Sequence, residues 1–377
     1  MTVDDREDQR DHMARALALA ERGWGQTAPN PMVGAVVVRG GEVVGEGWHT
    51  RYGAAHAEVE ALRAAGERAR GATMYVTLEP CAHSGKTPPC TDAIIAAGVS
   101  RVEIAAGDPN PAAAGGAARL RAAGVEVIAG VGLDAALELN AAFFASFAGR
   151  GPWVTLKLAV SMDSAIADAS GRSRWITGGE ARREVHRMRA GHDAIAVGIG
   201  TALADDPSLT VREVPAPRVA PTRVVFDRGA RLPLERALVR TAREVPTVVV
   251  VARDAPASRA RALEGAGVRV LRAESLAGAL GALGDGGIRS LLVEGGARLA
   301  GALLERRLVD RLVIFRAPVL LGEGALGAFA FAPSADVGHA ARYRVLQHRL
   351  VGDDAMTVYA PAGEGQDQSC SPASSTT

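Results

Sequence analysis

The sequence predicts two α/β domains in tandem, each built from a β-sheet layered with helices. Strand-like and helix-like segments alternate over residues 11–147, and a second alternation of the same kind occupies residues 148–361. The length of 377 residues suits about two domains. Hydrophobic residues make up 48% of the chain and charged residues 23%, so a full core is expected in each domain.

The first domain is predicted over residues 11–147, after a polar tail at 1–10. Residues 11–23 are predicted to form a helix, and GAVVVRGGEVVGEGWH predicts two strands joined by a Gly-Gly turn. Further along, HAEVEALRAAGERA predicts a helix and ATMYVTLEP a strand that enters a loop. TPPCTDAIIAAG then predicts a loop and a helix, and VSRVEIAAG predicts another strand.

The second domain is predicted over residues 148–361. Its strand candidates are VTLKLAV, DAIAVGIG, TRVVFD, PTVVVVAR, VRVLRA, SLLVEGG and DRLVIFRAPVLLG, with helical stretches between several of them and a last strand near MTVYAP. The tail at 362–377 lacks apolar periodicity, so it is predicted to be disordered.

Charge and cysteine content narrow the class of protein. The formal net charge is +1, so no strong field exists to attract nucleic acid. The start MTVDDREDQRDHM lacks the apolar core of a signal peptide, and no run of about 18 apolar residues could span a membrane. Three cysteines are too few to staple a secreted chain of this size. We therefore expect a cytoplasmic protein with neither a membrane nor a nucleic-acid partner.

Lysine is almost absent. Of 43 Lys and Arg residues, only Lys86 and Lys157 are lysines. Either they survive by chance, or a compact ammonium group is needed at these places where a planar guanidinium does not fit.

Two Pro-Cys pairs and an upstream His-x-Glu point to a metal site. His56 and Glu58 precede Cys81 and Cys90, the pattern of zinc nucleobase deaminases. One imidazole and two thiolates would hold zinc and leave a fourth position for water, which zinc makes nucleophilic. Glu58 would then move protons to the departing amine. Because helix positions i and i+2 do not share a face, His56 and Glu58 can both reach the site only if the helix begins there.

Two other interpretations of these residues stay open. The zinc could be structural, with His83 as a fourth ligand, or the cysteines could be buried apolar thiols. The usual deaminase pair is P-C-x-x-C, whereas here eight residues separate Cys81 from Cys90. The lengthened loop, which contains His83 and Lys86, can therefore reach a substrate.

The second domain offers weaker motifs. No G-x-G-x-x-G follows a strand, so a standard dinucleotide fold is not supported. Glu294-Gly295-Gly296 lies between a predicted strand and a predicted helix, where glycines let a phosphate approach a helix N-terminus. A tight strand-to-helix turn explains the same residues.

Several stretches together resemble one known family. PNPMVGAVVV, HAEVEAL, TLEPCAHSGKTPPCTDAIIAAGV and GDPNP in the first half, and LKLAVSMD, RWITG, DAIAVGIGTALADDPSLTVR and LLVEGGARLAGALL in the second, resemble the bifunctional riboflavin-biosynthesis deaminase–reductases. The resemblance covers roughly residues 11–360. It implies a cytidine-deaminase-like three-layer domain followed by a dihydrofolate-reductase-like α/β domain, with one Zn²⁺ per chain in the first and NADPH in the second.

The resemblance also implies a reaction and roles for the first domain. The substrate would be 2,5-diamino-6-(5-phosphoribosylamino)pyrimidin-4-one, deaminated and then reduced at its ribosyl group to a ribityl chain. Zinc would bind His56, Cys81 and Cys90, with Glu58 as the proton shuttle. The remaining contacts would be Asn30 to the pyrimidine, and His49, His83 and Lys86 to the ribose phosphate.

In the second domain the resemblance implies two sets of contacts. Substrate would meet Lys157, Ser173, Arg189, Asp205, Leu209, Arg212 and Glu294, and the cofactor would meet Ala159, Trp175, Thr201, Asp205, Gly295 and Gly296. Arg189 and Arg212 could instead be solvated surface charges. Lys157 lies in mid-strand, so it is either an edge residue or an inward-facing cation, and we favour the latter.

Two departures from the family pattern bear on function. The family usually has S-L-D-G where this chain has Ser161-Met162-Asp163-Ser164, which adds a Cβ where glycine would permit a positive φ or a close approach of the backbone. The stretch at 112–118 is also one residue shorter than the family pattern. Either departure could impair an activity.

Two rival functions remain open. One is a deaminase of tRNA or a free nucleobase with a non-catalytic C-terminal binding domain, and the other is a zinc-stabilised binding protein. Aromatic residues total only 4%, which disfavours a nucleic-acid stacking surface. We expect a small pyrimidine ribonucleotide as the substrate and a homo-oligomeric assembly.

Overall fold

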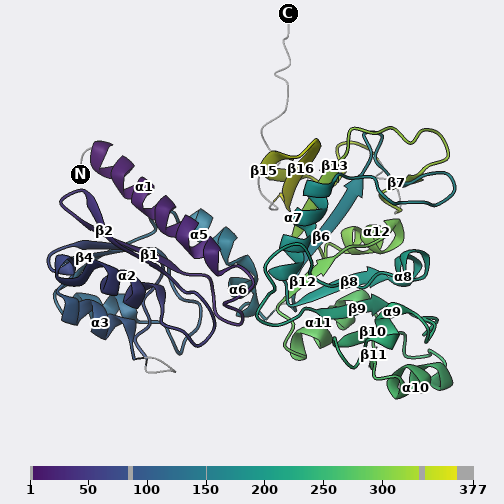
Figure 1. The fold of residues 1–377 in the computed structure, drawn as a ribbon, viewed down its shortest axis with the longest axis horizontal. Helices are drawn as coiled ribbons and strands as arrows, with labels where there is room; N and C mark the ends of the chain where they lie inside the picture. Colours follow the sequence, from purple (N-terminus) through teal and green to yellow (C-terminus); the bar gives the residue numbers. More distant parts are fainter. Residues whose placement is uncertain (1–2, 84–87, 150, 331–335, 363–377) are drawn as a thin grey trace, which may run out of the picture. The chain divides into compact units, whose positions relative to one another are not determined.

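The computed structural model describes residues 3–83, 88–149, 151–330 and 336–362. The chain separates into two compact units (Figure 1). Unit 1 comprises Met1–Arg150 and Ala216–Ala220, and unit 2 comprises Gly151–Pro215 and Pro221–Thr377. Both are α/β, as the sequence predicts.

Unit 1 is built on a five-stranded sheet of order β2-β1-β3-β4-β5. Its strands are β1 (Gly34–Arg39), β2 (Glu42–Trp48), β3 (Thr73–Leu78), β4 (Arg101–Ala106) and β5 (Glu126–Ala129). Its helices are α1 (Val3–Ala20), η1 (Glu21–Gly23), α2 (Ala57–Ala65), η2 (Gly66–Ala69), α3 (Cys90–Ala97), α4 (Gly116–Ala122), α5 (Leu133–Leu139) and α6 (Ala141–Ser146). The predicted hairpin is confirmed as the antiparallel pair β1–β2, whereas β3, β4 and β5 run parallel.

Helices cover both faces of this sheet, which makes three layers. Met13 and Leu19 of α1 pack with Val36 and Tyr75 on one face. On the other face, α2, α3 and α4 pack against alternate residues of the same strands. Figure 1 shows α1 and α5 on one side of the sheet and α2 and α3 on the other. Because the central strands β1 and β3 bury side chains on both faces, their sequences are mostly apolar.

The prediction of a polar tail at 1–10 is wrong, because α1 begins at Val3. Gln9 is 7% exposed, and its amide donates to the Glu103 carboxylate on β4 over 3.0 Å. A polar side chain thus faces the sheet and finds a partner there. Because the segment is mostly polar, hydrophobic periodicity does not predict that it forms a helix with one side chain facing the sheet.

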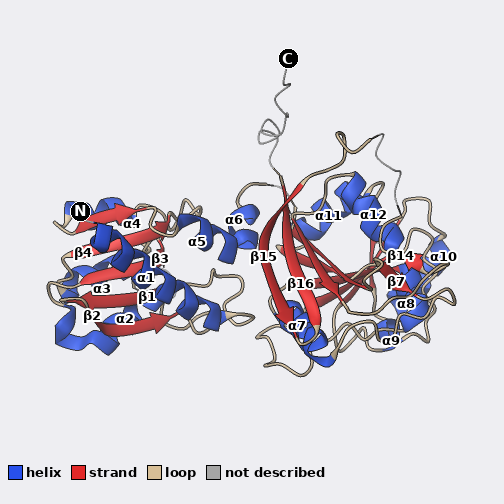
Figure 2. Cartoon of the chain, turned by 90° about the horizontal axis from the view of Figure 1, so that it is seen from above, coloured by secondary structure: helices blue, strands red, loops and turns tan. Residues whose placement is uncertain are grey.

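Unit 2 is built on a nine-stranded sheet of order β11-β10-β9-β8-β12-β6-β13-β16-β15. The strands are β6 (Trp153–Val160), β8 (Ala194–Gly198), β9 (Thr222–Phe226), β10 (Thr247–Val251), β11 (Arg269–Arg272), β12 (Ser290–Val293), β13 (Arg311–Arg316), β15 (Tyr343–Val351) and β16 (Asp354–Pro361). Strands from β11 to β13 are parallel, and β13, β16 and β15 are antiparallel. Figure 2 shows β15 and β16 side by side. A separate two-stranded sheet pairs β7 (Ala165–Ala167) with β14 (Leu326–Gly327).

The helices of unit 2 also lie on both faces of its sheet. They are α7 (Gly179–Ala190), α8 (Ile199–Asp205), α9 (Ala237–Arg240), α10 (Ala257–Gly265), α11 (Leu276–Asp285) and α12 (Ala297–Glu305). α11 and α12 pack on one face, and α7, α9 and α10 pack on the other. The chain travels outward from β8 to β11 and returns to place β12 between β8 and β6. Such a reversal of strand order opens a crevice at the carboxyl ends of the strands, where α/β proteins bind ligands.

Residues 216–220 group with unit 1, although the sequence prediction places them in the second domain. Within unit 1, the Arg218 backbone N–H donates to the Gly25 carbonyl over 2.9 Å, and the Arg218 guanidinium stacks on Tyr52. The tail predicted to be disordered lies outside the described residues from 363 onward. No helix in the described ranges is both long and apolar enough to cross a membrane.

Candidate active sites

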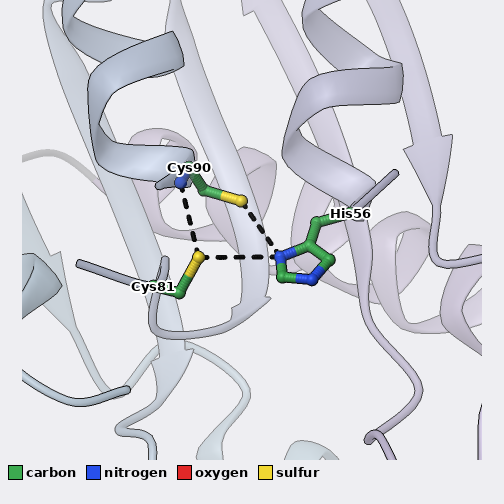
Figure 3. A group of neighbouring side chains, drawn as sticks. All are labelled: His56, Cys81 and Cys90. Atoms are coloured by element: carbon green, nitrogen blue, oxygen red, sulfur yellow. Dashed lines mark hydrogen bonds between the residues drawn. The ribbon is translucent and has the colours of Figure 1, made fainter. Parts of the chain in front are cut away.

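Three side chains that can bind a metal ion, one imidazole and two thiols, meet in unit 1 (Figure 3). The ligand atoms of His56, Cys81 and Cys90 lie within 4.8 Å of one another. His56 Nδ1 is 3.2 Å from Cys90 Sγ and 3.6 Å from Cys81 Sγ, and the Cys90 backbone N–H donates to Cys81 Sγ over 3.4 Å. One imidazole and two thiols around a single point form a suitable donor set for Zn²⁺ with one open position.

Local structure explains why these residues converge. His56 is the N-cap of α2 and Cys90 is the first residue of α3, while Cys81 follows the end of β3. The helix therefore begins at the site, and both His56 and Glu58 reach it, as the spacing required.

A glycine close to the site is fixed by close packing. A Cβ on Gly116 would come within 1.8 Å of the Pro80 carbonyl oxygen, directly before Cys81. The Ala117 N–H next to it donates to the Glu79 carboxylate over 2.9 Å. The shortened 112–118 stretch therefore still packs against the loop that carries Cys81.

The electrostatics of the site favour charge on one sulfur. A hydrogen bond from the Cys90 thiol lowers the pKa of Cys81 to about 4, with a further contribution from His56, although burial opposes it. The same hydrogen bond raises the pKa of Cys90, as does burial. A bound cation would remove the remaining thiol proton. Glu58 is 3% exposed, and burial raises the pKa of its carboxyl group.

Asn30 and His49 lie beside the three ligands. Asn30 Nδ2 is 3.2 Å from His49 Nε2, and His49 Nδ1 is 3.1 Å from the Ala55 carbonyl oxygen. The network assigns the ring proton to Nδ1, so that Nε2 accepts from the Asn30 amide. Burial lowers the pKa of His49, which agrees with a neutral ring. The His49 and His56 ring centroids are 5.4 Å apart.

Of the two loop residues predicted to contact substrate, His83 lies within the described residues and Lys86 does not. His83 is exposed, and within the described residues it is not part of the ligand cluster, which disfavours a structural site with four protein ligands. Lys86 lies outside the described residues.

A single large cavity occupies the carboxyl-end crevice of unit 2. Its volume is about 1690 Å³. Its lining includes every residue predicted for the second site: Lys157, Ala159, Ser173, Trp175, Arg189, Thr201, Asp205, Leu209, Arg212, Glu294, Gly295 and Gly296. They come from β6, α7, α8, the turn after β12 and two loops, so the topology alone gathers them.

A buried ion pair forms the floor of this cavity. Arg189 Nε donates to Glu294 Oε1 over 2.5 Å and Arg189 Nη2 donates to Oε2 over 2.9 Å, with both side chains 13% exposed. Burial alone would raise the pKa of Glu294, but Arg189 and Lys157 outweigh it and lower that pKa. Burial lowers the pKa of Lys157, and Arg189 adds to the effect. Arg189 is therefore not a solvated surface charge, and Lys157 faces the cavity.

Other contacts fix the loops around the cavity. Ser173 Oγ lies 3.5 Å from Asp205 Oδ1. Trp175 is 70% exposed, and the Arg182 guanidinium stacks on its ring at 4.8 Å.

Sequence analysis missed His186, which is buried on α7 and accepts a hydrogen bond at Nδ1 from the Arg212 backbone N–H over 3.1 Å. It lies one helical turn before Arg189. That spacing is the signal that could have found it.

Ser164 has a positive φ, a backbone conformation that glycine adopts more easily than serine. Its φ is 63°, in the left-handed region that favours glycine. The turn is nevertheless formed: Ser164 N–H donates to the Ser161 carbonyl over 3.0 Å, and its own carbonyl accepts from Ala328 over 3.0 Å.

Family models match both halves of the chain. The RibD C-terminal domain matches residues 152–355, and the cytidine and deoxycytidylate deaminase zinc-binding region matches residues 6–106.

Known proteins match most of the length. The riboflavin biosynthesis protein RibD of Aquifex aeolicus is 44% identical over 85% of this chain and 89% of its own, and that of Escherichia coli is 43% identical over 91% and 96%. The solved structure of Acinetobacter baumannii RibD superposes with a TM-score of 0.82 at 39% identity, covering 95% of this chain and all of that one. A Thermotoga maritima structure, described as a diaminohydroxyphosphoribosylaminopyrimidine deaminase/5-amino-6-(5-phosphoribosylamino)uracil reductase, has the same TM-score at 34% identity and the same coverage.

Proposed function

The chain belongs to the RibD family of bifunctional riboflavin-biosynthesis deaminase–reductases, and from this premise we propose how its residues divide the two reactions. Unit 1 deaminates 2,5-diamino-6-(5-phosphoribosylamino)pyrimidin-4-one, and unit 2 reduces the ribosyl group of the product to ribityl with NADPH. The observation that supports this most directly is the pairing of a His-Cys-Cys cluster in one unit with a cavity that has a charged floor in the other.

In the deaminase half, His56, Cys81 and Cys90 would hold Zn²⁺. When bound, zinc supplies a Lewis acid that makes water nucleophilic at neutral pH. Glu58 takes a proton from the attacking water and gives it to the exocyclic amine as that amine leaves. Two observations support this role: Glu58 lies in the first turn of α2, and its carboxyl group is hydrogen-bonded to the Cys90 thiol.

Substrate recognition in this half falls to groups beside the ligands. The Asn30 amide reads the edge of the pyrimidine, since the His49 ring holds it in one orientation. His83, together with Lys86 of the same loop, would meet the ribose phosphate, for which an imidazole and a point cation are suitable partners. His49, predicted for the same role, has both ring nitrogens engaged with Asn30 and Ala55, so we assign it to orienting Asn30 instead.

In the reductase half, NADPH supplies a hydride to C1′ of the ribosyl group when it is bound. The bond from C1′ to the ring oxygen breaks, so that oxygen needs a proton. Lys157 is the candidate donor, because its lowered pKa makes the ammonium group readier to release a proton. Arg189 keeps Glu294 ionised, and the negative charge of Glu294 in turn partly offsets the effect of burial on the pKa of Lys157.

The other cavity residues divide between the two ligands. Ser173, Asp205, Leu209 and Arg212 contact substrate, with Arg212 suited to its phosphate. The cofactor contacts are Ala159, Trp175, Thr201, Asp205, Gly295 and Gly296, the last being the N-cap of α12. We further infer a cytoplasmic homo-oligomer. Balanced charge and 4% aromatic residues do not favour the alternative of a tRNA deaminase.

Mass analysis of the products tests both halves. Zinc-loaded protein is given the diaminopyrimidinone ribonucleotide with and without NADPH, beside the Lys157→Ala variant. We expect deamination in every sample and reduction only in wild-type protein with NADPH. Deamination without any reduction would remove the reductase role. Neither reaction despite bound zinc would mean that the substrate is wrong, and a tRNA or free base would be tried next.

A further inference from the structure

The loop that follows α8 carries Arg212, the proposed partner of the substrate phosphate, and its backbone is strained. Most residues of the loop at 206–213 line the large cavity of unit 2. Three of them have both a Cβ and a positive φ: Asp206 at 41°, Leu209 at 49° and Glu213 at 63°. This conformation destabilises a residue with a Cβ, so it persists only where surrounding contacts hold the chain in place. The contacts that hold this loop therefore decide the shape of the substrate site.

The first half of the loop is fixed from the side of β9 and α9. The Asp206 carboxylate accepts a hydrogen bond from the Ala237 backbone N–H over 2.9 Å. The Leu209 side chain is buried and packs in the core with residues of β8, β9 and α9. Between them in sequence, the Ser208 carbonyl lies 3.4 Å from Nη1 of the buried Arg223 side chain. These contacts fix residues 206–209, whereas residues 210–213 take hydrogen bonds from α7.

α7 holds the second half of the loop at two points. Arg189 Nη1 donates to the Thr210 carbonyl over 3.0 Å. One helical turn earlier, His186 Nδ1 accepts from the Arg212 backbone N–H over 3.1 Å. Positions i and i+3 lie on the same face of a helix, so both side chains reach the same stretch of the loop. Because Arg189 also binds Glu294, the loop is tied to the ion pair at the cavity floor.

These two bonds also limit where the Arg212 guanidinium can lie. Its Nη1 donates to the Thr210 hydroxyl oxygen over 3.1 Å, so both the backbone and the side chain of Arg212 depend on groups that α7 holds. Arg212 is exposed at the cavity wall, where a free arginine side chain would sample many rotamers. A guanidinium that is fixed before the ligand arrives binds a phosphate more tightly, because less freedom is lost on binding.

The hydrogen bond to Arg212 requires one state of the His186 ring. Nδ1 can accept only when it carries no proton, so the proton of the neutral imidazole is on Nε2. Burial lowers the pKa of His186, and the positive charges of Arg189 and Arg212 lower it further. The ring is therefore neutral at about pH 7, and Nδ1 keeps the lone pair that the Arg212 N–H needs.

We propose that His186 is a positioning residue of the reductase: its Nδ1 fixes the backbone of Arg212, and so the place at which that guanidinium meets the substrate phosphate. This inference rests on the proposed contact between Arg212 and the phosphate. His186 acts through Arg212 rather than on the reacting carbon. It shares the task with Arg189, which holds the same loop two residues earlier.

Reduction kinetics with matched variants test this role. His186→Leu fills a similar volume without an acceptor, whereas His186→Asn keeps an acceptor oxygen at the δ position. We expect His186→Leu to raise the KM for 5-amino-6-(5-phosphoribosylamino)uracil about tenfold, the effect of one lost hydrogen bond. The kcat should change by less than about twofold, because the phosphate is bound equally in the ground state and the transition state. His186→Asn should restore most of the affinity.

The same substrate without its phosphate separates positioning from a general loosening of the site. 5-Amino-6-(ribosylamino)uracil has no phosphate for Arg212 to bind, so its KM should be the same for wild-type protein and for His186→Leu. His192→Leu is the control for the loss of an imidazole that supports the fold. His192 bonds the Met188 carbonyl and the Thr155 hydroxyl at 2.7 and 3.1 Å, and it is not among the residues that line the cavity. This variant should unfold at a lower temperature and keep the wild-type KM for the phosphorylated substrate.

A measurement on unaltered protein decides the question if His186→Leu does not fold. Nitrogen-15 NMR of the histidine rings, with His186→Asn used to identify the signals, should find the His186 proton on Nε2 and none on Nδ1 at neutral pH. A proton on Nδ1 is incompatible with the bond to the Arg212 N–H and would overturn the positioning role.

Three kinetic results would also overturn it while the reductase proposal stands. They are a wild-type KM for His186→Leu, an equal rise in KM for the substrate without its phosphate, and an equal rise in KM for His192→Leu. If wild-type protein reduces neither form of the substrate, the proposed function fails and this inference fails with it.

Discussion

The two active sites of this chain are assembled in opposite ways. The proposed zinc ligands come from a short stretch: His56 and Cys90 are 34 positions apart and lie at the starts of two successive α-helices. Arg189 and Glu294 of the reductase unit are separated by 105 positions, and five strands, β8 to β12, lie between them along the chain. The first site is a local motif on a small scaffold. The second exists only because β12 returns to lie between β8 and β6.

The difference also appears in the chemistry of the residues. The deaminase site depends on thiols and an imidazole, which are rare in this chain, so each one is conspicuous. The reductase site depends on Arg, Glu and a buried Lys, and arginine is the commonest cation here. In the cavity, the opposite charges of Arg189 and Glu294 stabilise one another. The His-Cys-Cys cluster of unit 1 includes no Lys or Arg, so a bound cation would supply the charge that stabilises its thiolates. Removing one group should therefore have different consequences in the two units.

The largest effect is expected from Glu58→Gln. The variant keeps the shape of the side chain and all three ligands but cannot move protons, so deamination should fall by about 10²- to 10⁴-fold. Zinc content, measured by elemental mass spectrometry, should not change. Reduction of supplied 5-amino-6-(5-phosphoribosylamino)uracil should continue at the normal rate, because the two sites share no residue.

Glu60→Gln provides the control for this prediction. Glu60 is two positions further along α2, and its carboxylate pairs with Arg63 on the surface. That variant should deaminate normally. Wild-type turnover by Glu58→Gln would show that the local motif has been assigned to the wrong carboxylate.

Arg189→Met should affect folding as well as reaction. It leaves Glu294 buried without its bidentate partner, and losing one member of a buried pair costs about 3–5 kcal/mol. Calorimetry should show an earlier unfolding transition for unit 2, and reduction should be lost. The double variant Arg189→Met/Glu294→Gln should recover part of the stability and none of the reduction.

Arg187→Met, on the same helix, separates this effect from a general loss of charge. Arg187 pairs with Glu184, and its side chain is 47% exposed, so the change should cost no more than about 1 kcal/mol. Equal destabilisation by both variants would mean that the cavity floor does not depend on the buried pair.

Sequence patterns found the local site more completely than the distributed one. The H-x-E and Pro-Cys spacing predicts the ligands and the helix start at His56, because each depends on neighbours along the chain. Periodicity also predicts the buried strands of both sheets, from β3 to β12. Periodicity does not show that α1 begins at Val3, because its first turns contain mostly polar residues. One of them, Gln9, is buried and donates a hydrogen bond to Glu103, which lies 94 positions away in the sequence.

In the reductase, most of the cavity residues could be named only through family resemblance. The one local signal for His186 is its spacing of one helical turn from Arg189, and its contact with the Arg212 backbone depends on segments that the fold brings together. The paired edge strand β15 was missed for a related reason. Its buried and exposed positions do not alternate with a period of two, so its sequence lacks the pattern of a half-buried strand.

The smallest predicted effect concerns Ser164, the place where unit 2 departs from its family. A left-handed φ of 63° destabilises the folded state by about 1–2 kcal/mol for a residue with a Cβ. Glycine avoids this cost, but its greater freedom in the unfolded chain lowers the free energy of unfolding by about 0.5–1 kcal/mol. Ser164→Gly should therefore stabilise unit 2 by roughly 0.5 kcal/mol, measured by calorimetry. Ser164→Ala keeps the Cβ and should give no gain. Reduction should proceed at the wild-type rate in both variants, because the turn and its hydrogen bonds to Ser161 and Ala328 are already formed. If Ser164→Gly reduced its substrate faster than wild-type protein, the serine would be distorting the cavity itself. The reductase site, which is assembled from distant segments, would then be sensitive to the conformation of a single turn.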